Sequence, residues 1–173
     1  MSAGPERRLQ LPPPEVQEFR RAVSRFATGV CVMTSRLDGH DHAMTANAFA
    51  SVSLEPLLVV VSVAEEARFL DAVLQCGVWG VSVLAEDARN AAEWLASPGR
   101  PVLSQLDRVA HHRGPATGVA LLDGALATLE CRTHATYPAG DHQLLVGEVV
   151  ALGGPVDPPA PLLYHQGRYR SMA

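Results

Sequence analysis

Met44-Thr45-Ala46-Asn47-Ala48-Phe49-Ala50-Ser51-Val52-Ser53-Leu54-Glu55-Pro56 is the stretch on which the interpretation of the chain depends. In extended backbone, alternate side chains point to one face, and here that face would carry Thr45, Asn47, Phe49, Ser51 and Ser53. A row of short hydroxyl and amide groups among small residues suits a flat polar ligand that approaches the backbone closely. An ordinary strand with its hydroxyl face in water has the same pattern, so the spacing alone leaves both interpretations open.

The flanking sequence predicts mainly β structure with a few helices. Apolar and alternating runs predict strands at 30–36, 42–46, 57–63, 78–84, 126–137, 143–152 and 162–164. Helical spacing predicts helices from Glu15 to about Phe26, at 64–75 and at 85–96. Many strands with few, non-alternating helices indicate an antiparallel barrel with helical covers, an α+β arrangement.

Two segments of this prediction bear on the site. The first helix has an apolar stripe, Val16, Phe19, Ala22, Val23 and Phe26, which we expect to pack as core over one end of the sheet. Residues 103–118 mix histidines and arginines with Gly and Pro, and we expect a long loop that helps to cover a site.

Length and composition indicate one globular domain. The 173 residues are 47% hydrophobic and 18% charged, with a net charge of -4, which argues against a nucleic-acid surface. No apolar run reaches the roughly 20 residues of a membrane span. We expect residues 1–14 to be a flexible tail, residues 15–173 to form the domain, and the protein to be cytoplasmic. The three cysteines suit reduced thiols, with Cys31 and Cys131 buried and inert.

Familiar catalytic motifs are absent from the sequence. It has no GxGxxG after a strand, no GxxxxGK[ST], no GxSxG and no HExxH. His40 and His42 flank a predicted turn, but no third ligand follows at a suitable spacing, so we expect exposed turn histidines and no metal site.

Several motifs together resemble the flavin reductase-like family, the small reductase components of two-component flavin monooxygenases. In chain order they are Phe26-Ala27-Thr28-Gly29-Val30, the stretch 45–56, Val78-Trp79-Gly80-Val81-Ser82-Val83-Leu84, Gly140-Asp141-His142 and Gly167-Arg168-Tyr169. The resemblance implies an FMN-binding split β-barrel that forms a homodimer. It also implies an NAD(P)H:flavin oxidoreductase that reduces FMN or FAD with NADH or NADPH and supplies a partner monooxygenase. A flavin-binding carrier or sensor without turnover is the alternative.

The resemblance also implies a set of site residues. The flavin would lie along Thr45, Ala46, Asn47, Ser51, Val52 and Ser53, and its phosphate would contact Arg68. His142, in the Gly-Asp-His motif, would be the catalytic residue that positions the nicotinamide, and Tyr169 would close the site. The sequence departs from the family at Ala67-Arg68-Phe69, where a Ser-x-Thr hydroxyl pair is usual. Arg68 would therefore carry more of the phosphate contact, or flavin would be held weakly.

Overall fold

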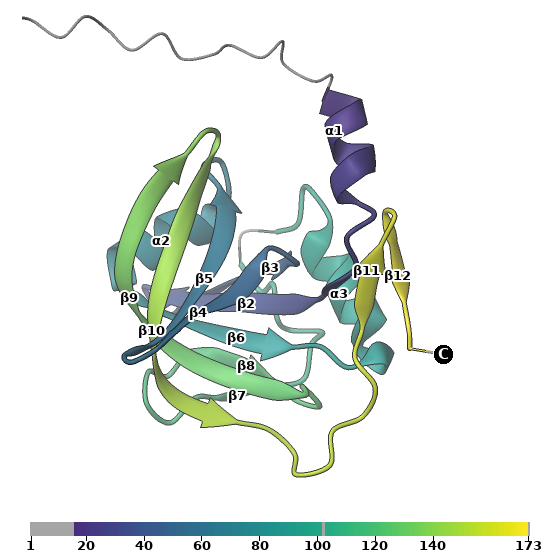
Figure 1. Ribbon diagram of the computed structural model, residues 1–173. Helices are drawn as coiled ribbons and strands as arrows, with labels where there is room; N and C mark the ends of the chain where they lie inside the picture. Colours follow the sequence, from purple (N-terminus) through teal and green to yellow (C-terminus); the bar gives the residue numbers. More distant parts are fainter. Residues whose placement is uncertain (1–15, 102, 173) are drawn as a thin grey trace, which may run out of the picture.

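The computed structural model describes residues 16–101 and 103–172, so the predicted tail at 1–14 lies outside the described residues. The first half contains α1 (Val16–Val23), β1 (Thr28–Gly29), β2 (Cys31–Leu37), β3 (His40–Ala46), β4 (Phe49–Leu54), β5 (Leu57–Ala64), α2 (Arg68–Cys76) and β6 (Val78–Val83). The second half contains η1 (Glu86–Ala88), α3 (Arg89–Ala96), β7 (His111–Arg113), β8 (Ala120–Leu122), β9 (Ala127–Ala139), β10 (His142–Gly153), β11 (Leu163–His165) and β12 (Arg168–Arg170). Figure 1 shows a β structure with helices at its margins, as predicted.

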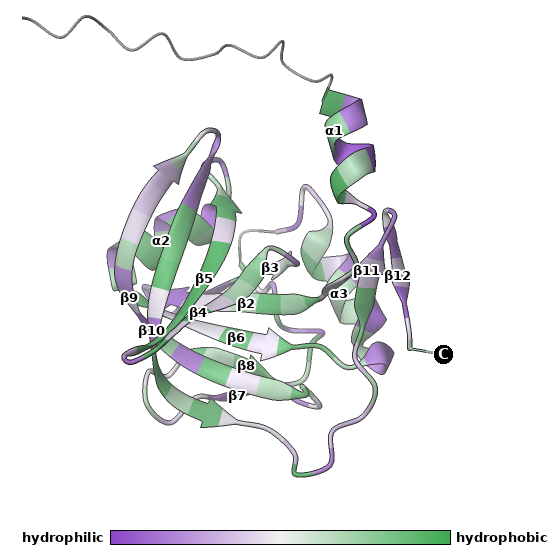
Figure 2. Ribbon diagram, in the orientation of Figure 1, coloured by the Kyte–Doolittle hydropathy of each residue, from purple (hydrophilic) through white to green (hydrophobic). Residues whose placement is uncertain are grey.

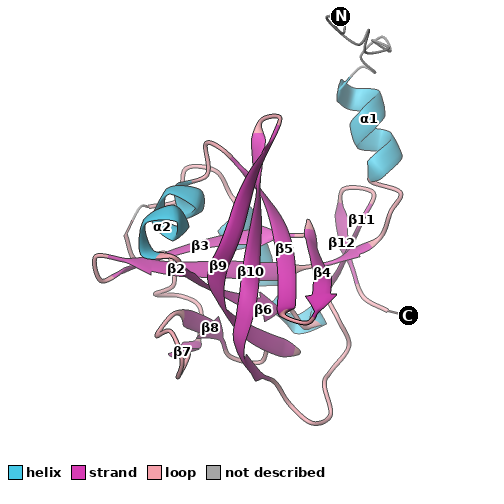
Figure 3. Ribbon diagram, turned by 60° about the vertical axis from the view of Figure 1, so that its left-hand side comes forward, coloured by secondary structure: helices cyan, strands magenta, loops and turns pink. Residues whose placement is uncertain are grey.

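The main sheet is antiparallel and strongly curved. Its order is β3-β2-β6-β9-β10-β5-β4, and the strands of the barrel cross one another in Figure 3. The two edge strands, β3 and β4, are consecutive in the chain and are joined by residues 47–48. The chain thus connects the two sheet edges, but among the described residues β3 and β4 do not pair, which leaves the barrel split within the segment 44–56.

Two buried clusters fill the fold. One lies among the barrel strands and α2 and includes Val61, Trp79 and Leu145, each fully buried. The other lies between β2, β3, α3 and β8. Gly147 is required by close approach, because a Cβ there would lie 2.3 Å from Cζ2 of Trp79. Cys31 and Cys131 are buried as predicted, and burial raises the pKa of each thiol to about 12.

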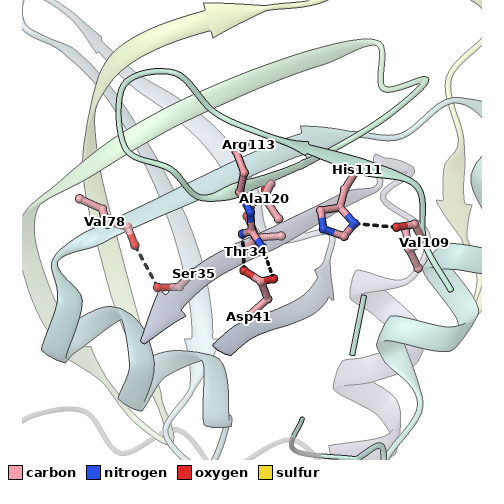
Figure 4. Close-up of polar contacts among 8 residues, drawn as sticks. All are labelled: Thr34, Ser35, Asp41, Val78, Val109, His111, Arg113 and Ala120. Atoms are coloured by element: carbon pink, nitrogen blue, oxygen red, sulfur yellow. Dashed lines mark hydrogen bonds and ion pairs between the residues drawn. The ribbon is translucent and has the colours of Figure 1, made fainter. Parts of the chain in front are cut away.

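The predicted long loop at 103–118 is only partly irregular. Residues 111–113 form β7, which pairs with β8, and β8 is buried. Figure 4 shows how this hairpin is attached: Arg113 makes a two-pronged ion pair with Asp41 at 2.6 and 2.7 Å, and the Thr34 hydroxyl donates to the carbonyl of Ala120. The rest of the described segment is irregular, as predicted. The short strand β7 was missed, and the side-chain contacts that attach its hairpin join residues about 70 to 90 positions apart, which local composition does not reveal.

The prediction that the first helix packs as core is wrong for the single chain. No residue of α1 is buried, and Phe19 and Phe26 are 56% and 78% exposed. The helix extends away from the barrel in Figures 1 and 3, and in Figure 2 it carries both hydrophobic and hydrophilic residues. The apolar stripe therefore exists, but residues 16–101 and 103–172 do not cover it.

The second predicted helix begins later than its periodicity suggests. β5 continues to Ala64 because each of its residues from 58 to 64 pairs with β10, and α2 begins only at Arg68. Gly77 ends this helix in the left-handed region, with φ of 72°, as predicted.

Candidate functional site

The segment 44–56 is bent where a straight strand was expected. β3 ends at Ala46, which joins the buried cluster inside the barrel. Thr45 points the other way, and its hydroxyl donates to the carbonyl of Ala92 in α3 at 2.7 Å. After the bend at 47–48, Phe49 packs on the same inner cluster as Ala46. Thr45 and Phe49 therefore lie on different sides of the sheet, and the prediction of one continuous polar face is wrong.

A bulge in β4 interrupts the pattern a second time. Ser51 is opposite Val59 whereas Ser53 is opposite Leu58, so Val52 is an additional residue. Ser51 and Val52 are exposed, and the Ser53 hydroxyl accepts a hydrogen bond from the N–H of Glu55 at 3.2 Å. These three predicted ligands lie on the outer edge strand of the single chain.

A large hollow lies between α1, the start of β4 and the C-terminal hairpin. Its volume is about 1020 Å³, and its walls are mainly apolar. The residues lining it include Phe26, Ala27, Val30, Ala48, Phe49, Ala50 and Tyr164. Asn47 supplies a polar group, and its amide donates to the Thr28 hydroxyl at 3.2 Å. A concave, mainly apolar site with few polar groups is typical of cofactor sites.

A smaller hollow of about 190 Å³ brings four of the predicted residues together: Thr45, Ala46, Asn47 and Tyr169. The Tyr169 ring meets Tyr164 edge-on at 5.3 Å, and the Arg89 guanidinium lies 5.9 Å from its centre. Burial, with the neighbouring Tyr164, raises the pKa of the Tyr169 phenol. Tyr169 is therefore held as one wall of the hollow, in its neutral form at physiological pH.

Arg68 lines a third hollow, of about 380 Å³, which it shares with Thr45. This hollow lies at the start of α2, facing residues 97–100. Arg68 Nη2 donates to the carbonyl of Arg100 at 2.9 Å. Sequence reasoning missed Arg100, for which the only signal was its place directly after the Ser97-Pro98-Gly99 break.

His42 is placed differently from the prediction of an exposed turn histidine. Its side chain is partly buried, and Nδ1 has no hydrogen-bond partner among the described residues. Burial lowers the pKa of His42, and the positive charges of Arg68 and His40 lower it further. His42 is thus close enough to Arg68 for the arginine charge to lower the pKa of its imidazole.

His142 begins β10, directly opposite Ala64 at the end of β5. Its Nδ1 lies 2.7 Å from the Asp141 carboxylate, and this contact is the main cause of the lowered pKa of Asp141. Neither His142 nor the three residues 51–53 line the three hollows described above. However, Ala64 does line the hollow of Arg68, and directly opposed residues share a face of a sheet. His142 therefore lies beside that hollow and not inside it.

Two findings concern other kinds of site. Within residues 16–101 and 103–172, no group of three or more His, Cys, Asp or Glu residues could hold a metal ion. In the same part of the chain, every helix is too short or too polar to cross a membrane.

Residues 23–173 match the family model described as the flavin reductase like domain, and the chain belongs to this family. It is 41% identical over 160 residues to the reductase component of 4-hydroxyphenylacetate 3-monooxygenase from Thermus thermophilus, covering 90% of this chain and 96% of that protein. Its fold resembles BorF, the flavin reductase component of a bacterial two-component tryptophan halogenase, with a TM-score of 0.86 and 42% identity over 91% of this chain and 98% of the other. It also resembles the NADH:FAD oxidoreductase SgcE6 of Streptomyces globisporus in complex with NAD and FAD fragments, with a TM-score of 0.86 and 34% identity over 92% and 93% of the two chains. The predicted family and split-barrel fold are confirmed.

Proposed function

We propose that this protein is an NAD(P)H:flavin oxidoreductase that reduces FMN or FAD and supplies the reduced flavin to a partner monooxygenase. The observation that carries the proposal is a series of three hollows with shared walls along the segment 44–50. One is large and apolar, one is small and contains Tyr169, and one contains Arg68. The names of the three relatives support it, since they are a monooxygenase reductase component, a halogenase flavin reductase and an NADH:FAD oxidoreductase.

The dimensions and chemistry of the hollows fit a flavin. The mainly apolar walls around Phe49 and Ala50 suit a planar aromatic ring system, and the Asn47 amide can hydrogen-bond a polar ring edge. Arg68, at the opposite end of the series, suits a phosphate group because arginine binds phosphate through two N–H donors. Thr45 lies between the two ends, since it lines both smaller hollows.

When flavin and nicotinamide are bound together, they supply the hydride chemistry themselves, and the protein needs to bind and orient them. In this scheme the Asn47 end of the hollows orients the flavin ring. Tyr169 limits access from the C-terminal hairpin. His142 donates or accepts one hydrogen bond that positions the nicotinamide, from a place on the sheet beside the hollow of Arg68.

A homodimer would complete this site. The described residues of one chain do not cover the apolar stripe of α1, and β4 is an open sheet edge with exposed Val52 and Leu54. Both surfaces adjoin the large hollow: Val23 of α1 and the following Phe26 line it, and so do Phe49 and Ala50 at the start of β4. A second copy related by a two-fold axis would bury both surfaces and bring the exposed Ser51 and Val52 and the half-buried Ser53 into a closed site. We also propose a cytoplasmic location, which the three free thiols support.

A direct assay tests the activity. Protein is mixed with NADH or NADPH and with FMN or FAD, and nicotinamide oxidation is followed by absorbance. The His142→Ala variant should lower kcat/KM for the nicotinamide by a few-fold to about a hundredfold, the range expected for one lost hydrogen bond. Flavin affinity should change little. The matched control is His134→Ala, because His134 is an exposed histidine on β9 whose side chain forms no hydrogen bond with the described residues.

The outcomes separate the proposal from its alternative. A protein that binds flavin but oxidises neither nicotinamide is a carrier or sensor. A protein that binds neither flavin at high micromolar concentration has another function. Equal loss of flavin and nicotinamide binding in His142→Ala would show that His142 has a different role.

A further inference from the structure

Two arginines from distant parts of the chain meet at the third hollow without an acidic partner. Arg68 begins α2, and Arg100 follows α3. Neither guanidinium forms an ion pair with a carboxylate of residues 16–101 or 103–172. Two like charges held together in a partly buried site repel each other, and a bound anion would relieve that repulsion.

The protein uses only part of the hydrogen-bonding capacity of these arginines. Arg100 Nη1 donates to the carbonyl of Ser97 at 2.7 Å, and Nη2 donates to the carbonyl of Ala43 at 3.0 Å. Its Nε–H is buried and has no acceptor among the described residues. Arg68 makes one described hydrogen bond, to the backbone carbonyl of Arg100. A guanidinium has five N–H donors, so four donors of Arg68 and three of Arg100 form no hydrogen bond with residues 16–101 or 103–172.

The surroundings are electropositive. Burial lowers the pKa of Arg100, and the charge of Arg68 lowers it further, so the two cations interact directly. The lowered pKa of His42 reports the same field. Among the described residues that line the hollow, Glu66 is the one carboxylate, and it is exposed and forms no ion pair with the described residues. The hollow of about 380 Å³ is large enough for a phosphate with part of the chain attached to it.

The carbonyl contacts of Arg100 hold it in this position. Through Ser97 and Ala43, one side chain links the end of α3 to the middle of β3. The Arg68 contact to the Arg100 carbonyl adds the start of α2 to the same network. Three elements thus orient the two guanidinium groups toward one hollow, which is the arrangement expected of a prepared anion site.

We propose that Arg100 is a second phosphate-binding residue and that, together with Arg68, it makes the site prefer phosphorylated flavins over riboflavin. This inference rests on the proposed function. Ala67 and Phe69 replace the hydroxyl residues that are usual in the family near the flavin phosphate. In this inference Arg100, from the turn at 97–100, supplies a phosphate contact in their place. Because the paired cations replace two neutral hydroxyl donors, flavin binding in this protein depends on ionic strength.

The test compares three ligands that differ in phosphate content: riboflavin, FMN and FAD. Their affinities are measured by fluorescence titration for the wild type, Arg100→Gln, Arg100→Lys and Arg68→Gln. We expect Arg100→Gln to weaken FMN and FAD binding by about tenfold to a hundredfold, the effect of losing one charge-assisted hydrogen bond, with riboflavin affinity nearly unchanged. Arg100→Lys keeps the charge and should lose less. Raising the salt concentration should weaken FMN binding more in the wild type than in Arg100→Gln.

The control variant is Arg132→Gln, since Arg132 is an exposed arginine on β9 whose side chain forms no ion pair or hydrogen bond with the described residues. It should leave all three affinities unchanged. Riboflavin is an internal control for folding. If Arg100→Gln weakens riboflavin and FMN equally, Arg100 only holds the turn and the inference is overturned. Unchanged FMN affinity in Arg100→Gln would overturn it too. A wild type that binds none of the three would instead refute the proposed function, and inorganic pyrophosphate would then test the anion site by a thermal shift absent in Arg100→Gln.

Discussion

The substitution Phe19→Ala tests whether a second copy of the chain covers α1. Phe19 is 56% exposed in the single chain. A phenylalanine offers about 200 Å² of surface, so about 110 Å² of Phe19 remains in water. At about 25 cal/mol per Å², complete burial in a dimer would contribute roughly 2.8 kcal/mol for each copy.

A two-fold interface contains this contact twice, so the upper limit is about 5–6 kcal/mol. Binding recovers only part of the buried-area energy, and half of the limit is a reasonable expectation. That half corresponds to a rise in the dimer dissociation constant of about a hundredfold. The substitution does not weaken α1 itself, because alanine is the better helix former.

Sedimentation or light scattering over a range of concentrations measures this constant, and the flavin reductase assay is run on the same samples. Gln17→Ala is the matched control: it is on the same helix, about 200° around the axis from Phe19, and it is also exposed. The reasoning fails if the wild type is a fully active monomer at tens of micromolar. It also fails if Phe19→Ala dissociates no more readily than Gln17→Ala.

Three further predictions concern the stability of the fold. The Glu130 carboxylate is buried and accepts hydrogen bonds from two backbone N–H groups and one hydroxyl. Glu130→Gln should therefore lower the free energy of unfolding in urea by about 1.5–3 kcal/mol. An unchanged free energy would show that these hydrogen bonds do not stabilise the fold. Gly147→Ala should lower the same quantity by about 1–3 kcal/mol because the new methyl group overlaps the ring of Trp79, and a variant as stable as the wild type would show that the ring moves freely. Because burial raises the pKa of Cys31 and Cys131 from 9.0 to about 12, the stability that their protonated thiols contribute is complete below pH 9 and is lost as the pH rises toward 12. In the native protein at about pH 8, both thiols should resist alkylation as followed by mass spectrometry, and rapid labelling of either would argue against its burial.

Local sequence was sufficient for most of the strands and for the family. The continuous apolar run at 57–63 predicted β5, and the alternation in 126–137 predicted β9. Both patterns are local, because the side chains of a strand point alternately to its two faces and the buried faces are apolar. Gly77 predicted the end of α2, because a left-handed residue is needed there and glycine adopts it without strain. These features depend on a residue and its near neighbours, and so they can be predicted without knowing the fold.

The candidate site was only partly predictable. The segment 44–56 and Arg68 were identified, and the structure gathers Thr45, Ala46, Asn47 and Tyr169 around one hollow. The regular alternation expected through the segment was wrong because the chain bends where it passes from one sheet edge to the other, and because a bulge follows in β4. A strand period carries no information about which partner strand is present or where the register shifts.

Tertiary structure alone decided which distant groups meet. Arg100 has no motif, and it joins Arg68 only because the end of α3 and the start of α2 both lie beside β3. The apolar stripe of α1 was evident in the sequence. Amphipathic periodicity predicts that one face of a helix is buried, but it does not identify the surface that buries it. For this protein the sequence determined the helices, most of the strands and the family, while long-range packing determined the shape of the site, because contacts between residues far apart in the chain leave no local pattern.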